Sequence, residues 1–124
     1  MKRILLIAAI LLSSCQRGVT VTVVPLPHQR LSIEVHEGFL GNPCVRQVQL
    51  FQVHAGERLE LWRIAQPRTS SACLNRFIYP DVPAGFQMSR RQSVSFPLDV
   101  DYLIAVSGYG FDGGATFRWV EARS

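Results

Sequence analysis

Alternating apolar and polar positions dominate the chain from residue 19 onward. Residues 19–24 read Val-Thr-Val-Thr-Val-Val, and Leu31, Ile33 and Val35 alternate with polar neighbours. A period of two, carried by β-branched residues, is typical of strands that bury one face. We therefore expect the first two strands in these segments.

Two further strands are expected at residues 45–53 and 58–64, with a hairpin turn at residues 54–57, His-Ala-Gly-Glu. The alternation fails at Leu50-Phe51 and at Leu61-Trp62, where apolar residues occupy both faces. This pattern indicates either a bulge or a strand that is covered on both sides.

Residues 66–92 are interrupted by three prolines and a glycine, and only residues 76–79, Arg-Phe-Ile-Tyr, resemble the core of a strand. We expect one short edge strand and a long ordered loop here. Long ordered loops are often functional, so the arginines of this segment form one candidate binding surface. They are Arg68, Arg76, Arg90 and Arg91.

The last part of the chain alternates at residues 92–98, at 102–106 and again at 116–120. Asp112-Gly113 lies between the last two segments and predicts a hairpin turn. Exposed aromatic side chains at a loop tip supply rigid contact area, so Tyr109, Phe111 and Asp112 form the candidate binding loop. The alternative is that both rings fold back onto the end of the domain.

No stretch after residue 18 shows an apolar stripe of helical period, so we expect almost no helix. Seven or eight short strands separated by turns predict an all-β fold, an antiparallel β-sandwich formed by one domain over residues 19–124. A closed barrel is the alternative. We expect Trp62 and Trp119 to pack in the core, because large aromatic side chains dominate small cores.

The amino terminus has the features of a secretory signal. Two basic residues precede an apolar run at residues 4–12, which is too short to span a bilayer. The next residues, Leu12-Ser13-Ser14-Cys15, resemble the lipobox of bacterial lipoproteins. The resemblance implies that residues 1–14 are removed and that Cys15 is acylated. Residues 15–18 would form a short tether, and Gln16 in place of an aspartate implies the periplasmic face of the outer membrane.

With Cys15 assigned to lipid, Cys44 and Cys73 remain as an even pair in an oxidising compartment, and we predict a disulfide between them. Closing this loop would stabilise the fold by about 3.5 kcal/mol in the chain-entropy description. The alternative is a pair of thiols that binds a metal or does redox chemistry, but the Cys-x-x-Cys spacing typical of such sites is absent.

The charge of the mature chain is small. Residues 15–124 contain 11 arginines and 9 acidic residues, a net charge of +2, and the arginines are scattered. A nucleic-acid partner is therefore not expected.

Few residues suggest a reaction. Glu34 and His36 share a strand face on which two metal ligands could stand, but no His-x-His or helical His-Glu-x-x-His array accompanies them, so we expect a solvated polar face instead. Asp99 and Asp101 are paired carboxylates, which we expect to cap turn amides instead of doing acid/base work. No serine lies in a nucleophile elbow. We expect no enzymatic activity, no metal site at the histidines and no cofactor; the histidines are His28, His36 and His54.

Residues 96–106 resemble the approach to the penultimate strand of immunoglobulin-like and fibronectin-type domains. In those domains the matching tyrosine, here Tyr102, bonds its hydroxyl to upstream backbone. Neither cysteine lies two residues after Tyr102, so the expected disulfide differs from the intersheet bond of antibody domains.

In overall plan the chain resembles small enterobacterial lipoproteins regarded as immunity proteins for secreted toxins. We expect a non-enzymatic protein-binding module anchored to the membrane by lipid, either an immunity protein or a part of an envelope complex. One alternative is binding of a small ligand or cell-wall glycan by Tyr109, Phe111 or Trp62. Another is lysozyme inhibition, since Ser107-Gly108 and residues 117–119 are similar to the serine loop and aromatic strand of periplasmic lysozyme-inhibitor lipoproteins, although the spacing departs from theirs.

Overall fold

The computed structural model describes residues 19–37, 43–91 and 100–119. These residues form eight strands and no helix. The predicted strand at residues 92–98 lies outside the described residues, as does Asp99. In chain order the strands are β1 (Val19–Leu26), β2 (Arg30–Glu37), β3 (Val45–His54), β4 (Glu57–Ala65), β5 (Arg76–Tyr79), β6 (Gln87–Arg91), β7 (Asp101–Gly108) and β8 (Phe111–Arg118).

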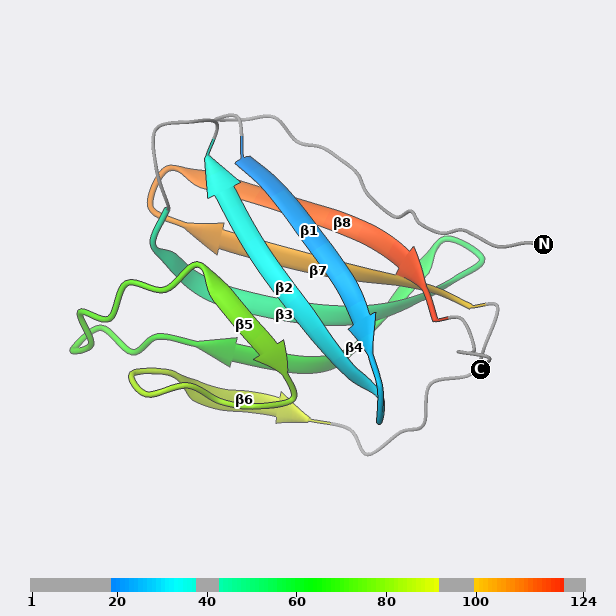
Figure 1. Cartoon of the computed structure of the whole chain (residues 1–124), viewed down its shortest axis with the longest axis horizontal. Coiled ribbons are helices and arrows are strands. Elements are labelled where there is room, and N and C mark those ends of the chain that lie inside the picture. The colour runs from blue at the N-terminus through cyan, green and yellow to red at the C-terminus, as the bar shows by residue number, and fades with distance from the viewer. Residues whose placement is uncertain (1–18, 38–42, 92–99, 120–124) are drawn as a thin grey trace.

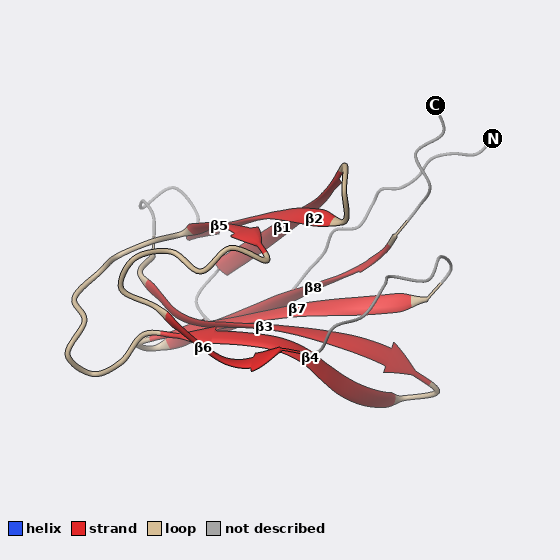
Figure 2. Cartoon of the chain, turned by 90° about the horizontal axis from the view of Figure 1, so that it is seen from below, coloured by secondary structure: helices blue, strands red, loops and turns tan. Residues whose placement is uncertain are grey.

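The strands form two antiparallel sheets that pack face to face, so the predicted β-sandwich is confirmed (Figures 1 and 2). The smaller sheet has the order β1-β2-β5 and the larger sheet the order β6-β4-β3-β7-β8. Because the sheets are separate, the barrel alternative is wrong. The order β1-β2-β5 against β4-β3-β7-β8 matches the A-B-E and C′-C-F-G order of immunoglobulin-like sandwiches, with β6 added beside β4.

The β3–β4 hairpin has the predicted turn, and it has a bulge, one of the two explanations for the failed alternation. Its two-residue turn, Ala55-Gly56, has φ values of 53° and 83°, the left-handed conformations that a tight hairpin needs. Leu50 pairs with Trp62 and Phe51 pairs with Glu60, which leaves Leu61 as the extra residue of a bulge. The bulge explains how Leu61 and Trp62, adjacent in sequence, are both buried.

Two expectations about connections are wrong. Residues 66–92 contain a second strand, β6, which pairs with the edge of β4 despite the prolines upstream of it. The β7–β8 turn is Tyr109-Gly110, since Gly108 pairs with Phe111 and Ser107 pairs with Asp112. Gly110 supplies the positive φ of 81° that this turn needs, so Asp112-Gly113 continues the strand instead of turning it.

The core lies between the inner faces of the two sheets. Trp62 of the larger sheet meets Tyr79 of the smaller one edge to face, with 4.9 Å between ring centroids. Trp62 is fully buried and Trp119 is 8% exposed, which confirms the expectation that both pack in the core. The other fully buried large side chains of the described residues are Tyr102, Leu31, Ile33, Leu50, Leu61, Ile64, Ile104, Val35, Val45 and Val48.

Cys44 and Cys73 form the predicted disulfide, with 4.5 Å between their Cα atoms. Cys44 directly precedes β3 of the larger sheet, and Cys73 lies shortly before β5 of the smaller sheet. The backbone N–H of Val45 also donates to the carbonyl of Leu74 at 2.9 Å. The bond therefore links the two sheets at one end of the sandwich instead of crossing its core.

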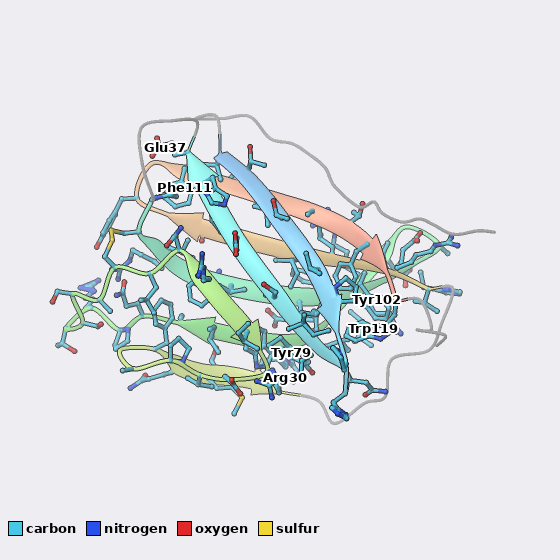
Figure 3. All side chains as sticks on the ribbon, in the orientation of Figure 1. Arg30, Glu37, Tyr79, Tyr102, Phe111 and Trp119 are labelled. Atoms are coloured by element: carbon cyan, nitrogen blue, oxygen red, sulfur yellow. A yellow bond between two sulfur atoms is a disulfide. The ribbon has the colours of Figure 1, made fainter. Side chains whose placement is uncertain are left out.

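Tyr102 lies at the start of β7, the position of the penultimate strand, and is fully buried. Burial raises the pKa of its phenol above the ordinary value, and a hydrogen bond with the Gln52 side chain acts in the opposite direction. Figure 3 shows Tyr102 beside Trp119, at the end of the molecule away from Glu37 and Phe111. The upstream backbone at residues 92–99, which a tyrosine corner would use, lies outside the described residues.

Candidate functional site

The outward-facing residues of the larger sheet form the broadest surface of the fold, which we call the large outer face. On its two central strands, β3 and β7, they alternate with the buried residues Val48, Leu50 and Ile104. All of them are half-buried except the exposed Asp101 at one end. They are Gln47, Gln49, Phe51 and Val53 on β3, with Asp101, Leu103, Ala105 and Ser107 on β7.

An uncharged strip runs along the middle of this face. Phe51 pairs directly with Leu103, and Gln49 pairs with Ala105. On β8, Gly114 pairs with Ala105 and adds no side chain to the strip. A Cβ at Gly114 would lie 2.9 Å from the carbonyl oxygen of Ile104 and 3.4 Å from the side chain of Leu103, so glycine keeps this part of the face flat. We call Phe51, Val53, Leu103 and Ala105 the central strip.

Charged groups flank the central strip on the β4 and β6 side. Glu60, whose side chain is 15% exposed, accepts hydrogen bonds from Gln49 Nε2 at 2.8 Å and from an Arg63 terminal nitrogen at 3.0 Å. Arg90 Nε lies 3.6 Å from the same carboxylate. Gln47 extends the network by donating to Gln49 at 3.3 Å. The network fixes five side chains from three strands at one edge of the strip.

The carboxyl of Glu60 has a pKa below its ordinary value. Burial by itself raises this pKa, but the hydrogen bonds from Gln49 and Arg63 and the charges of Arg63 and Arg90 together outweigh it. Glu60 is therefore ionised at neutral pH and holds both arginines in place.

Further charged groups border the central strip. The guanidinium of Arg58 lies over the ring of Phe51, 5.8 Å from its centroid. Arg118 Nε donates to Asp101 Oδ1 at 2.7 Å across the β7–β8 pair. The turn that Asp101 is expected to cap lies outside the described residues, and in the structure its carboxylate meets the arginine directly opposite on β8.

The outer face of the smaller sheet, which we call the small outer face, has a different composition. Glu34 Oε1 lies 3.3 Å from His36 Nε2, and Glu34 Oε2 lies 3.4 Å from Arg76 Nε. The threonines of β1 pair with these groups, Thr20 with His36 and Thr22 with Glu34. Glu34 and His36 therefore lie on a polar face that is open to water.

Of the candidate loop, only Tyr109 stands at the hairpin tip. Its side chain is 77% exposed, the highest value among the large hydrophobic residues that the structure describes. The guanidinium of Arg46 lies over its ring, 4.6 Å from the centroid. Cation and ring together form a compact polar–aromatic tip.

Phe111 and Asp112 lie on β8 and not in a loop, which corrects the sequence-based expectation for both. A Cβ at Gly108 would lie 2.5 Å from the Phe111 ring, so this ring folds back over the hairpin. Figure 3 shows Phe111 at the same end of the sandwich as Glu37. Asp112 is an exposed residue that pairs with Ser107, itself within β7.

The structure does not bring the candidate arginines together. Arg76 belongs to the small outer face, whereas Arg90 extends the Glu60 network on the larger sheet. Arg68 is exposed in the connection between β4 and β5. Arg91 ends β6, and its side chain lies outside the described residues. Arg68, Arg76 and Arg90 therefore lie at separate positions and do not form one basic surface.

The three histidines are also dispersed. His28 lies in the β1–β2 turn, His36 near the end of β2 and His54 at the end of β3. In the described part of the chain, no three His, Cys, Asp or Glu side chains come together as metal ligands would. The same residues include no helix with the length and apolarity to cross a membrane.

Sequence reasoning missed the large outer face. Its signal was present, because Phe51 and Leu103 are apolar residues at positions that alternate with core residues. In the sequence they indicated only an imperfect strand pattern. Only the pairing of β3 with β7 places Phe51 and Leu103 side by side as an apolar strip.

Comparison of the chain with protein-family models, with curated proteins and with solved structures found no match.

Proposed function

We propose that this chain is a lipoprotein anchored through Cys15 at the periplasmic face of the outer membrane, and that it binds a protein partner without catalysing a reaction. The large outer face is the proposed contact surface. The lipobox-like residues 12–15 support the anchor. The observation that supports partner binding is the central strip, an uncharged row on paired strands that is flanked by fixed charges.

This arrangement has the properties of a protein interface. Interface centres are depleted of charge and enriched in aromatic and apolar groups, whereas their rims are polar. Phe51 and Leu103 supply apolar area at the centre, and the Glu60 network and the Arg118–Asp101 pair supply the rim. Because Glu60 holds Arg63 and Arg90 in place before binding, less side-chain entropy is lost when a partner docks.

Site-specific photo-crosslinking in intact cells tests the proposal. A photoreactive amino acid at position 105 on the large outer face is compared with one at position 22 on the small outer face, in protein whose lipid on Cys15 is verified by mass spectrometry. We expect one discrete heavier adduct at position 105 and none at position 22. Equal adducts at both positions, or none at either, would contradict the proposed surface.

The identity of the adduct then separates the two forms of the proposal. A secreted toxin would indicate an immunity role, and a resident envelope protein would indicate a component of an envelope complex. An adduct between two copies of this chain would instead assign the face to self-association.

A further inference from the structure

Resting on the proposed anchor at Cys15, we infer that one end of the sandwich lies against the lipid surface, with Tyr109 in the headgroup region. This end, which we call the disulfide end, comprises Val19, residues 43–46, residues 66–75 and the hairpin at residues 108–111. The large outer face would then stand upright from the membrane.

The short chain between Cys15 and Val19 limits how far the domain can stand from lipid. Val19, where β1 begins, is four residues after Cys15. Four residues span at most about 14 Å in any conformation. In contrast, β3 leaves the disulfide end at Val45 and reaches His54 nine residues later, roughly 30 Å away. The disulfide end is therefore held close to the lipid surface, and the opposite end touches it only if the domain lies on its side.

Several contacts place the Tyr109 hairpin next to the start of β1. A Cβ at Gly113, three residues after the hairpin tip, would lie 3.3 Å from the Val19 side chain. Gly108, on the other arm of the hairpin, pairs with Val45, and Val45 also bridges to Leu74. The anchor point, the hairpin and the loop that carries the disulfide thus belong to one end (Figure 1).

The chemistry of this end suits the boundary between lipid and water. An exposed tyrosine places an apolar ring in the headgroup region and keeps its hydroxyl in contact with water. Arg46, stacked on that ring, has donors that match a lipid phosphate. Its position is fixed by Gln66, whose side-chain oxygen accepts from Arg46 at 2.9 Å. Gln66 is itself buried and donates to Ser70 Oγ and to the carbonyl of Ala72.

In the part of the opposite end that the structure describes, no Phe, Tyr or Trp ring stands at a hairpin tip, and the ring beneath Arg58 is the half-buried Phe51 of the large outer face. The hairpins of this end turn at residues 27–29 and at Ala55-Gly56, and neither turn contains Phe, Tyr or Trp. Next to the first turn, Arg30 and Asp81 form an exposed ion pair of 2.9 Å, which has no reason to leave water. The exposed aromatic ring therefore lies at the end of the domain that the short tether holds close to lipid, and the exposed ion pair lies at the other end.

Fluorescence quenching by lipid tests the orientation. The acylated protein is reconstituted in phosphatidylethanolamine and phosphatidylglycerol vesicles that contain phospholipids brominated on the acyl chains. Tyr109→Trp reports on the disulfide end, and His54→Trp is the matched control on the opposite end. Trp62 and Trp119 are buried in both proteins and give a common background.

We expect brominated lipid to remove a larger part of the emission of Tyr109→Trp than of His54→Trp, with a blue shift for Tyr109→Trp alone. Equal quenching of the two variants would indicate a domain lying on its side and would overturn the inference, as would stronger quenching at position 54. A mass spectrum without lipid on Cys15 would overturn the proposed anchor itself, which distinguishes the two failures.

Discussion

The two outer faces of the sandwich differ, although the inner faces they back are equally buried. The small outer face carries threonines and the Glu34 ion pairs with His36 and Arg76. The large outer face places Phe51 beside Leu103 and keeps its charges at the rim. A sheet with one solvated face needs only polar residues there, as the small outer face shows.

The large outer face has features that a solvated sheet surface does not need. Isolated apolar side chains at a surface are ordinary and need no explanation. On the large outer face they are instead neighbours on paired strands, next to a network that fixes Glu60 and two arginines. A solvated sheet face requires neither feature, and both fit the proposed binding role.

The largest expected effect is on the free energy of unfolding, and it tests whether the inner faces of the two sheets contribute equally to stability. Leu50→Ala in β3 and Ile33→Ala in β2 each remove a fully buried side chain. Each should lower the free energy of unfolding by about 2–5 kcal/mol, because a cavity remains in a core that cannot collapse around it. Chemical denaturation of the disulfide-bonded protein measures both values. A loss below about 1 kcal/mol in one sheet alone would show that the two inner faces are not equivalent.

A smaller effect is expected when a charge is placed on the outer faces. Ala105→Arg sets a guanidinium in the middle of the central strip, and Thr22→Arg is the matched change on the small outer face. We expect Ala105→Arg to weaken binding of the crosslinked partner by about 2 kcal/mol or more, roughly 30-fold, and Thr22→Arg to leave it unchanged. Calorimetric titration measures the affinity. Similar losses in the two variants would remove the distinction between the faces.

The thermal stability of both arginine variants serves as the control for this comparison. Neither position contributes to the buried core, so both variants should retain the midpoint of the parent protein to within a few degrees, as for surface substitutions of about 0.5 kcal/mol.

The smallest expected effect concerns acid sensitivity. The pKa of Glu60 is lower in the folded protein than in the unfolded chain, so its carboxylate stabilises the fold above the unfolded pKa. That stability is lost as pH falls through the folded pKa. Glu60→Gln should therefore cost about 1 kcal/mol at pH 7 and make the remaining stability less dependent on pH below about 4.5.

Glu34→Gln is the matched variant on the small outer face, where the partners of the carboxylate, His36 and Arg76, are largely exposed. Exposed ion pairs contribute little, so we expect a loss of no more than about 0.5 kcal/mol at pH 7. Denaturant titrations of both variants from pH 3 to 7 give the comparison. A larger loss for Glu34→Gln than for Glu60→Gln would contradict the interpretation of the rim network.

Local pattern predicted much of the fold. The strands at residues 19–26 and 30–37 follow from strict alternation, and the Ala55-Gly56 turn follows from the conformational freedom of glycine. The failed alternation at Leu61-Trp62 indicated either a bulge or a strand covered on both sides, and the structure has the bulge. In each of these cases the deciding interactions lie within a few residues along the chain.

Non-local pairing decided the elements that the pattern did not give. Strand β6 has weak alternation and forms because the edge of β4 offers it a ladder. The β7–β8 register sets Gly108 against Phe111, so the turn falls at Tyr109-Gly110 although Asp112-Gly113 is an equally good turn sequence. That shift moved Phe111 and Asp112 from the expected tip into β8 and left Tyr109 alone there.

By itself, the sequence determined the all-β class, most strand positions and the pairing of Cys44 with Cys73, since these depend on side-chain alternation and on the count of cysteines. Only the tertiary structure decided which outward residues become neighbours. Phe51 and Leu103 are far apart in the chain and adjacent in the larger sheet. Likewise, Tyr109 stands beside Arg46, and Gly113 of the same hairpin lies against Val19. A surface is a property of strand order and register, which no local pattern specifies.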